Sequence, residues 1–197
     1  MPHIATKLMI VTDSFLTLGA PKFSDARLAG LAAAQGSLAA WRDAVSGDAK
    51  NAVVGVSGDF ALALRDWNGR TFLAVDRFAI PSLCYRVTDG QLQFAARADE
   101  LANAQTAIDP QAIFDYLYFH VIPSPRTIYK GIFRLPPGHY ALFENGQLAV
   151  APYWVPTFDE QSNVSFDSLK AEFRQLMRDA VATQRLPFEA YSQGNGS

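Results

Sequence analysis

The stretch GDFALALRDWNGRTFLAVDRFAIPSLCYRVTDGQLQFAARADEL, from Gly58 to Leu101, decides the fold of this chain. Over residues 60–64, large side chains alternate with alanines, which is typical of a strand that fills a core on one face and packs closely on the other. Asn68-Gly69 and Asp89-Gly90 are strong hairpin signals, because both central residues of a type I′ turn need a positive φ. The segment is therefore predicted to form four strands of an antiparallel meander.

Helices and a last hairpin are predicted around this segment. Ser24-Asp25 offers N-cap oxygens to a helix over 26–41, with an interruption at Gly36. Asp109-Pro110 begins a second helix, which runs to about His120 and carries an apolar face. The remaining predicted elements are a buried strand over 7–11, an irregular connection over 121–137, a hairpin over 139–151 and an amphipathic helix over 166–183 capped by Ser165.

Composition and charge exclude several classes of protein. The 197 residues are 49% hydrophobic and 18% charged, which predicts one globular domain. Basic and acidic residues, 17 and 19, are spread along the chain, so no nucleic-acid partner is predicted. The sequence has neither a secretory signal nor an apolar run that could span a bilayer, and we expect a cytoplasmic protein without a membrane partner. A single cysteine, Cys84, and three scattered histidines predict no disulfide and no metal site.

Several separated motifs follow one another in a recognisable order. They are GDFALALRD (58–66), DRFAIPSLCY (76–85), FAARADEL (94–101), IDPQA (108–112), YL (116–117), PRTIYKGI (125–132), LPPGH (135–139) and YW (153–154). The first three resemble the patterns G-x-F-A-F-A-x-x-D, R-D-x-x-G-I-x-P-L-Y-Y and F-A-S-E-x-K-A-L. These patterns are those of the glutaminase domain of asparagine synthetases, which are class II glutamine amidotransferases with the N-terminal-nucleophile hydrolase fold.

The resemblance covers about residues 24–197 and implies an architecture. The fold class is α/β (α+β), an N-terminal-nucleophile-hydrolase-like four-layer sandwich of two mainly antiparallel sheets flanked by helices and trimmed at the N-terminus. A glutaminase-like domain is expected over 1–184. Residues 185–197 are expected to form a tail at the position where a synthetase domain would begin.

The nucleophile of the family is not found in this sequence. A class II glutaminase uses an N-terminal cysteine that becomes exposed when the initiator Met is lost. Position 2 is Pro2, and the sole thiol, Cys84, is expected to be a small buried hydrophobe in a strand. The family's R-G-P-D segment has no counterpart in this sequence. Its oxyanion segment is matched only weakly, by residues 12–15. No catalytic residue is therefore assigned, and the chain alone is expected to be inactive.

One residue of the substrate site is a candidate. Ser24-Asp25-Ala26-Arg27 resembles the family's S-D-x-E, in which the Asp receives the α-amino group of the substrate, so Asp25 is a candidate ammonium acceptor. The alternative is an N-cap, worth about 1 kcal/mol to the helix. Arg27 stands where the family has Glu and reverses a charge beside this site. Asp76-Arg77 is interpreted as a buried structural pair or a backbone-binding corner.

The C-terminus contains a degenerate phosphate-binding pattern. The resemblance implies an ATP-pyrophosphatase domain whose S-G-G-x-D-S loop holds pyrophosphate. Ser192, Gly194 and Ser197 keep a spaced S-x-G-x-x-S, whereas Gln193 and Gly196 depart from it. A solvated tail is the alternative. No cofactor is predicted for this chain, and ATP and magnesium are implied only for an absent synthetase domain.

Two classes of function remain open. The first is an asparagine synthetase-related amidotransferase-like domain without glutaminase activity, associated with amide-forming ligase chemistry in a synthetase-domain or other protein partner. The second is a non-catalytic binding or assembly module that keeps the fold as a scaffold for a partner protein, or a homodimer. Exposed apolar patches on its sheets or helices would favour the second class, and glutamine affinity that depends on Asp25 would favour the first.

Overall fold

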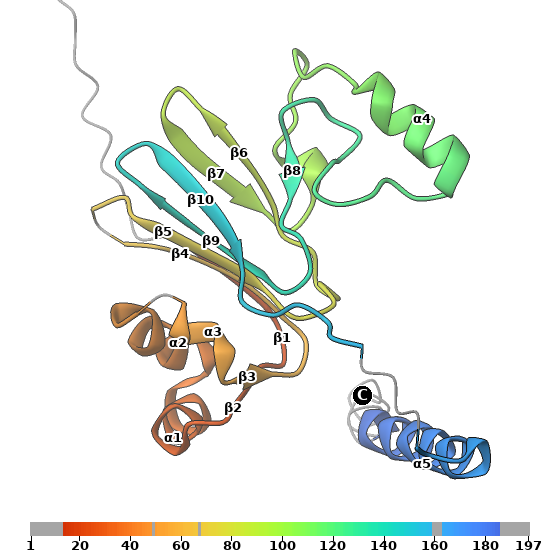
Figure 1. The fold of residues 1–197 in the computed structure, drawn as a ribbon. Coiled ribbons are helices and arrows are strands. Elements are labelled where there is room, and N and C mark those ends of the chain that lie inside the picture. The colour runs from red at the N-terminus through yellow and green to blue at the C-terminus, as the bar shows by residue number, and fades with distance from the viewer. Residues whose placement is uncertain (1–13, 49, 67, 159–162, 186–197) are drawn as a thin grey trace, which may run out of the picture. The chain divides into compact units, whose positions relative to one another are not determined.

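The computed structural model describes residues 14–48, 50–66, 68–158 and 163–185 (Figure 1). The chain divides into two compact units, Met1–Val155 and Pro156–Ser197, and each is considered by itself. The strand predicted over 7–11 lies outside the described residues. Among the helices of the described part, none is both long and apolar enough to cross a membrane.

The first unit is built on two antiparallel sheets. A five-stranded sheet has the order β1-β4-β5-β9-β10, and a three-stranded sheet has the order β7-β6-β8. A two-stranded ribbon pairs β2 with β3. The strands are β1 (Ser14–Gly19), β2 (Lys22–Phe23), β3 (Val56–Ser57), β4 (Phe60–Arg65), β5 (Thr71–Val75), β6 (Cys84–Thr88), β7 (Gln91–Ala95), β8 (Phe133–Arg134), β9 (His139–Glu144) and β10 (Gln147–Pro152).

The two faces of β4 pack against different layers, as its alternating sequence predicts. Phe60, Leu62 and Leu64 face a cluster that contains Trp41 of the helical layer. Ala61 and Ala63 face the opposite cluster, to which β6, β7 and the segment after β8 contribute apolar side chains. Small side chains on this second face allow the two sheets to approach each other closely. The five-stranded sheet is therefore the middle layer, buried on both sides.

Three helices cover one face of the five-stranded sheet (Figure 1). They are α1 (Ala26–Gln35), α2 (Ser37–Ser46) and α3 (Asn51–Val54). The predicted interruption at Gly36 is confirmed: this residue has a φ of 89° and separates α1 from α2. A glycine is favoured there because that φ strains any residue with a Cβ. The mixed α/β fold with antiparallel sheets and helices is thus confirmed, whereas the four-layer nucleophile-hydrolase form stays a prediction.

The prediction of a single four-strand meander is wrong in one respect. Hairpins β4-β5 and β6-β7 both form, but they belong to different sheets. The chain turns out of the first sheet after Val75 at a corner around Asp76, where Ala79 has a φ of 51°. Alternation of side chains is a property of each strand alone, so it does not say in which sheet a strand lies.

Of the three predicted two-residue turns, two form and one is replaced by a longer loop. At Asp89-Gly90 and Asn145-Gly146 both residues have positive φ, which is the type I′ geometry. At Asn68-Gly69, the glycine has a φ of 83°. There the Asp66 carboxylate accepts hydrogen bonds from the backbone N–H groups of Asn68 and Arg70, and a longer loop replaces the two-residue turn. An aspartate side chain can accept hydrogen bonds from nearby backbone N–H groups, and this stabilises an alternative to the tight turn.

Besides the two-residue strands β2 and β3, two strands were not predicted from the sequence. β1 begins at Ser14, within the segment that resembles a strand stop, and pairs along its whole length with β4. β8 lies inside the connection predicted to be irregular and pairs with β6. Both depend on a partner strand far along the chain, and local propensity does not contain that information.

Two further elements complete the first unit, and one helix belongs to the second. The 3-10 helix η1 (Ala98–Glu100) follows β7, and α4 (Pro110–Phe119) starts at the predicted Asp109 cap. In the second unit, α5 (Phe166–Arg185) is capped by Ser165, whose Oγ accepts a hydrogen bond from the Ser168 N–H at 3.2 Å. The apolar stripe of α5 is exposed within its unit, at Phe166, Leu169, Phe173, Leu176, Met177 and Val181.

Candidate functional site

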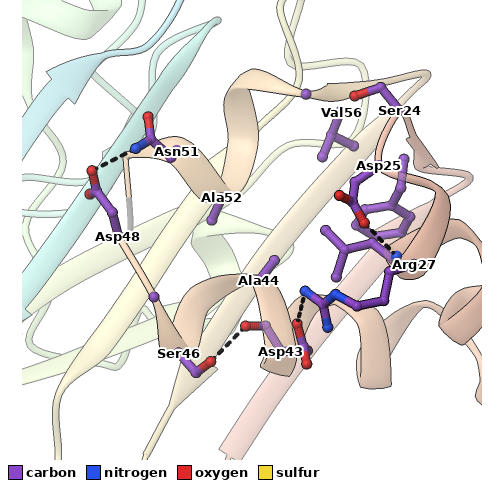
Figure 2. Close-up of a pocket in the computed structure, with 14 residues that line it drawn as sticks. Ser24, Asp25, Arg27, Asp43, Ala44, Ser46, Asp48, Asn51, Ala52 and Val56 are labelled. Carbon is purple, nitrogen blue, oxygen red and sulfur yellow. Dashed lines mark hydrogen bonds and ion pairs between the residues drawn. The ribbon is translucent and has the colours of Figure 1, made fainter.

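A pocket of about 560 Å³ lies among α1, α2, α3 and the β2-β3 ribbon (Figure 2). The chain brings Asp25 to it from the start of α1 and Asp43 from α2. Asp48 and Asn51 come from the turn before α3 and from its first residue. This is the one place at which a candidate residue of the sequence resemblance, Asp25, borders a described cavity.

Asp25 is the N-cap of α1. Its Oδ1 accepts a hydrogen bond from the Leu28 N–H at 2.9 Å, so the predicted capping role is confirmed. The cap leaves the carboxylate at the rim of the pocket, and the geometry does not test its role as an ammonium acceptor. An aspartate at this position also interacts favourably with the positive end of the helix dipole.

Arg27, the residue that departs from the family pattern, is engaged by an ion pair. Its Nη2 lies 2.6 Å from Oδ2 of Asp43 on the neighbouring helix. The hydrogen bond between the two groups raises the pKa of Arg27 and lowers the pKa of Asp43. The side chains of Arg27 and Asp43 are 66% and 37% exposed, so solvent weakens this pair.

The far side of the pocket is organised by Asp48. Its Oδ1 accepts a hydrogen bond from the Lys50 N–H at 3.0 Å, and its Oδ2 accepts one from Nδ2 of Asn51 at 2.8 Å (Figure 2). Near the ribbon, Ser24 donates a backbone hydrogen bond to the Gly55 carbonyl at 2.9 Å. A Cβ on Gly55 would lie 2.7 Å from Oγ of Ser24, so a glycine keeps this wall open.

The charges of the lining favour a cationic group. Three carboxylates, of Asp25, Asp43 and Asp48, face one guanidinium, that of Arg27. The lining contains serine hydroxyls but no cysteine or histidine. The pocket can therefore attract an ammonium group by its charge, whereas it offers neither a thiol nucleophile nor an imidazole base.

A second pocket, of about 390 Å³, has the opposite charge. It lies at the ends of β4 and β5 beside α2, and its ionisable lining residues are Arg42, Arg65, Arg70 and Asp66. The Arg65 guanidinium is already bound, because it donates hydrogen bonds to the Thr71 hydroxyl and the Leu92 carbonyl and lies over the Phe94 ring. We therefore assign no ligand to this pocket.

Cys84 lies away from both pockets. It is 2% exposed on β6, in a small core cluster with Leu101 and Ile132, so the expected buried hydrophobe is confirmed. Burial raises the pKa of its thiol, and this effect outweighs the opposite influence of the nearby Arg134 guanidinium. A thiol that is buried and protonated is a poor nucleophile.

Asp76 is a backbone-binding corner, one of its two predicted roles. It is 2% exposed, and its carboxylate accepts hydrogen bonds from the N–H groups of Phe60, Phe78 and Ile80 at 3.2, 2.8 and 3.1 Å. Its neighbour Arg77 is exposed and lies over the Trp154 ring. The carboxylate thus holds the exit of β5 against the start of β4 and has no part in the pocket.

The other candidate residues are not brought to the pocket. Ser192, Gly194 and Ser197 lie outside the described residues, as do Thr12 and Asp13. Phe15, which belongs to the weak match to the family's oxyanion segment, lies on β1 at the edge of the five-stranded sheet. Asp43 was missed from the sequence because its partner Arg27 is sixteen positions earlier. Asp48 was missed as well, although its hydrogen bonds to the Lys50 N–H and to Asn51 are local to one turn.

Comparison with known proteins shows the family of this chain and several relatives. A family model described as "Glutamine amidotransferase domain" matches residues 43–154, more than half of the chain. The chain belongs to this family. The match includes Asp43 and Asp48 and the whole of β4 to β10, whereas Asp25 and Arg27 precede it.

The relatives are asparagine synthetases. A "Putative asparagine synthetase [glutamine-hydrolyzing]" of Mycobacterium tuberculosis is 31% identical over 137 residues, which cover 64% of this chain and 21% of the relative. The "Asparagine synthetase [glutamine-hydrolyzing] 1" of Bacillus subtilis is 27% identical over 128 residues, which cover 63% and 20%. The chain thus contains an asparagine synthetase-type glutamine amidotransferase domain, and it matches about a fifth of the length of these relatives.

Proposed function

We propose that this domain does not hydrolyse glutamine and that it accompanies amide-forming ligase chemistry carried out by a synthetase-domain partner. The observation that carries the proposal is the environment of Cys84. The sole thiol of the chain is 2% exposed, its pKa is raised by burial, and it does not line the pocket that contains Asp25. Glutamine hydrolysis by a thiolate needs an accessible nucleophile beside the bound amide.

The pocket supports a residual binding role in this proposal. Its three carboxylates and one paired guanidinium suit the α-ammonium group of an amino acid. In this interpretation Oδ1 of Asp25 caps α1, and the remaining lone pairs of the carboxylate accept hydrogen bonds from the ammonium group of the ligand. Ligand occupancy would then stabilise the packing of the three helices on the sheet.

ATP and magnesium belong, in this proposal, to the synthetase partner. The residues of the degenerate phosphate pattern, Ser192, Gly194 and Ser197, fall beyond the described part of the chain. Within the described ranges, no group of three or more His, Cys, Asp and Glu side chains is arranged to hold a metal ion. The described residues thus offer no ligand set for magnesium, and we derive no step through either cofactor.

Release of glutamate from glutamine tests the proposal directly. The purified chain and its Cys84→Ser variant are incubated with glutamine, and glutamate is measured by mass spectrometry against a buffer blank. We expect no release above the blank from either protein. Glutamate release by the unmodified chain would overturn the proposal. Its loss in Cys84→Ser would identify Cys84 as the nucleophile, and its persistence in the variant would show a different nucleophile.

A specific observation also favours the second class of function, a binding or assembly module. The apolar residues of α4 are exposed, whereas the sequence alone suggests a face buried in a core. Phe114, Leu117 and Tyr118 are 59%, 71% and 69% exposed. An exposed apolar patch of this kind marks an interaction site more often than ordinary surface.

A further inference from the structure

We propose that the pocket among α1, α2, α3 and the β2-β3 ribbon selects an α-amino acid whose side chain ends in a cation, such as lysine, rather than glutamine. This selection rests on the proposed function, since the amino acid is taken to bind beside Asp25. Two new roles are assigned. Arg27 holds the α-carboxylate of the ligand, and Asp48 holds its side-chain cation together with the C-terminal end of α2.

The charged groups of the lining are divided between two sides of the pocket. Figure 2 shows Asp25 and Arg27 on one side and Asp48 and Asn51 on the other. The first side combines a carboxylate with a guanidinium, and both come from the start of α1. This combination matches the ammonium and carboxylate groups of an α-amino acid, whereas a simple amine would use the carboxylate of Asp25 alone.

Arg27 can bind a carboxylate in addition to that of Asp43. Its side chain is 66% exposed, and its Nη2 lies 2.6 Å from Oδ2 of Asp43. A guanidinium carries five N–H donors in a planar fork, so it can pair with two carboxylates at once. The hydrogen bond to Asp43 and, to a smaller extent, the charge of Asp25 raise the pKa of Arg27. A cation is thus held close to the carboxylate that would receive the α-ammonium group.

The other side of the pocket lies at the C-terminal end of α2, and such an end attracts cations. Ala44, Ser46 and Gly47 line the pocket there. The last four carbonyl groups of a helix have no partner within it and carry a partial negative charge. One of them, that of Asp43, accepts a hydrogen bond from the Ser46 hydroxyl at 2.7 Å. The last turn of α2 has no basic residue, so a cation of the ligand would complement this end.

Asp48 adds a full negative charge beside the end of α2. Its oxygens accept hydrogen bonds from the Lys50 N–H and from Nδ2 of Asn51, which fix the carboxylate in place. Each carboxylate oxygen can accept more than one hydrogen bond, so both can still accept from an ammonium group. Among the described lining residues the one cation, Arg27, belongs to the opposite side. This second side therefore favours a positively charged side chain over a neutral amide.

The charge balance distinguishes the candidate ligands. Three carboxylates and one guanidinium leave the lining with an excess of negative charge. Glutamine is a zwitterion and leaves this excess unchanged, whereas lysine has one net positive charge and reduces it. A diamine reduces it further but offers no carboxylate to Arg27. The volume of about 560 Å³ lies within the ~300–1,000 Å³ of small-molecule pockets. A basic amino acid is thus the ligand that uses both sides.

Isothermal titration calorimetry of the full 197-residue chain at low ionic strength tests this selection with matched ligands. They are L-lysine, L-glutamine, L-norleucine, which lacks the side-chain amine of lysine, and cadaverine, which lacks its carboxylate. We expect lysine to bind about fivefold more tightly than each of the other three, which is the factor that one partly screened ion pair contributes.

Two variants separate the two assigned roles. Asp48→Asn keeps a side-chain acceptor but removes the charge, so it should abolish the preference for lysine over norleucine. Arg27→Gln should abolish the preference for lysine over cadaverine. Asp89→Asn makes the same exchange in the β6-β7 turn and should leave all four affinities unchanged. Circular dichroism checks that the variants are folded, and the comparison of ligands on the unmodified chain needs no variant.

Each contrary outcome has a distinct meaning. Lysine that binds no more tightly than norleucine, or a preference that survives Asp48→Asn, overturns the cation site. Cadaverine that binds as tightly as lysine, or a preference that survives Arg27→Gln, overturns the carboxylate site. If glutamine binds and lysine has no advantage, the selection is wrong while the binding role proposed above stands. If none of the four ligands binds, both are wrong. Glutamate release is measured separately, so the absence of glutaminase activity does not depend on these titrations.

Discussion

Two buried aspartates hold two regions of the first unit in different ways. Asp76, at the exit of β5, is surrounded by the two-sheet core and accepts hydrogen bonds only from backbone N–H groups. Asp115, on α4, accepts hydrogen bonds only from the side chains of Gln111 and Arg126. Around Asp76 apolar packing supplies the stability and the carboxylate fixes the path of the chain. Around Asp115 little apolar surface is buried, so the carboxylate itself attaches the helix.

The comparison predicts different consequences when either carboxylate is lost. A core that depends on Asp76 should unfold as a whole, because three buried backbone donors would lose their acceptor. A helix that depends on Asp115 should detach while the sheets stay folded. Four measurements test this contrast.

The largest effect is expected for Asp76→Ala. Loss of three charge-assisted hydrogen bonds in a buried corner should lower the free energy of unfolding by about 3–5 kcal/mol. Urea denaturation followed by circular dichroism measures it. Asp89→Asn, an exposed change in a turn that tolerates asparagine, is the matched control and should be neutral. A loss smaller than about 1 kcal/mol would refute the role of Asp76 as the corner of the core.

Asp115→Ala should cost less and act locally. We expect about 2 kcal/mol, since Arg126 is 42% exposed and keeps Asp109 and water as partners. Amide hydrogen exchange should speed up over α4 and remain slow in β4 and β5. Gln111→Ala, which removes one neutral donor, provides the smaller reference effect. Equal acceleration across both sheets would mean that α4 belongs to the cooperative core, contrary to the comparison.

A third carboxylate extends the contrast to the pocket. Asp25→Ala should lower the free energy of unfolding by about 1 kcal/mol through loss of the α1 cap, whereas Asp25→Asn should be nearly neutral because asparagine caps as well as aspartate. Ammonium binding needs the charge, so calorimetric titration with glutamine should lose its signal in both variants. If the Asn variant binds glutamine as strongly as the unmodified chain does, Asp25 only caps the helix and does not bind the ammonium group.

The smallest effect is a pH dependence at the Asp76 corner. The Tyr153 hydroxyl donates a hydrogen bond to the Val75 carbonyl at 2.8 Å, and burial raises the pKa of Tyr153 to about 12 from 10. The folded chain therefore keeps a proton that the unfolded chain loses, so stability should fall as the pH rises from 10 towards 12.

Because the ring is partly exposed, we expect this alkaline loss to be below about 1 kcal/mol. Denaturation of the unmodified chain and of Tyr153→Phe along a pH series measures it. The difference between the two free energies of unfolding should shrink as the pH rises through this range. A constant difference would show that the hydroxyl does not titrate differently in the folded state.

Much of the fold could be predicted because its signals are local. The alternation in residues 60–64, the Asp-Pro start of α4 and the positive-φ pairs at 89–90 and 145–146 each depend on a few neighbouring residues. The departures concern distant partners. β1 was missed because its strand character comes from pairing with β4, and the predicted meander divides because β6 and β7 pair with β8 in the smaller sheet.

The candidate site was predicted in part for the same reason. Asp25 was found from a short motif. Asp48, whose hydrogen bonds are local to one turn, and the Asp43–Arg27 pair, which joins two helices, were not predicted. A pocket is formed by surfaces that meet only after folding, so one sequence segment contains only a part of it.

The starts of α1, α4 and α5, the hairpins, the inner strand β4 and the family could all be predicted without a structure, because caps, turns and alternation act over a few residues. The folded structure was needed to choose between the two predicted roles of Asp76, to show that Arg77 stays outside, and to show that the apolar residues of α4 are exposed. An apolar stripe looks the same in a sequence whether or not something covers it. A side chain is buried by residues that are far from it in the sequence, and these contact it only after the chain has folded.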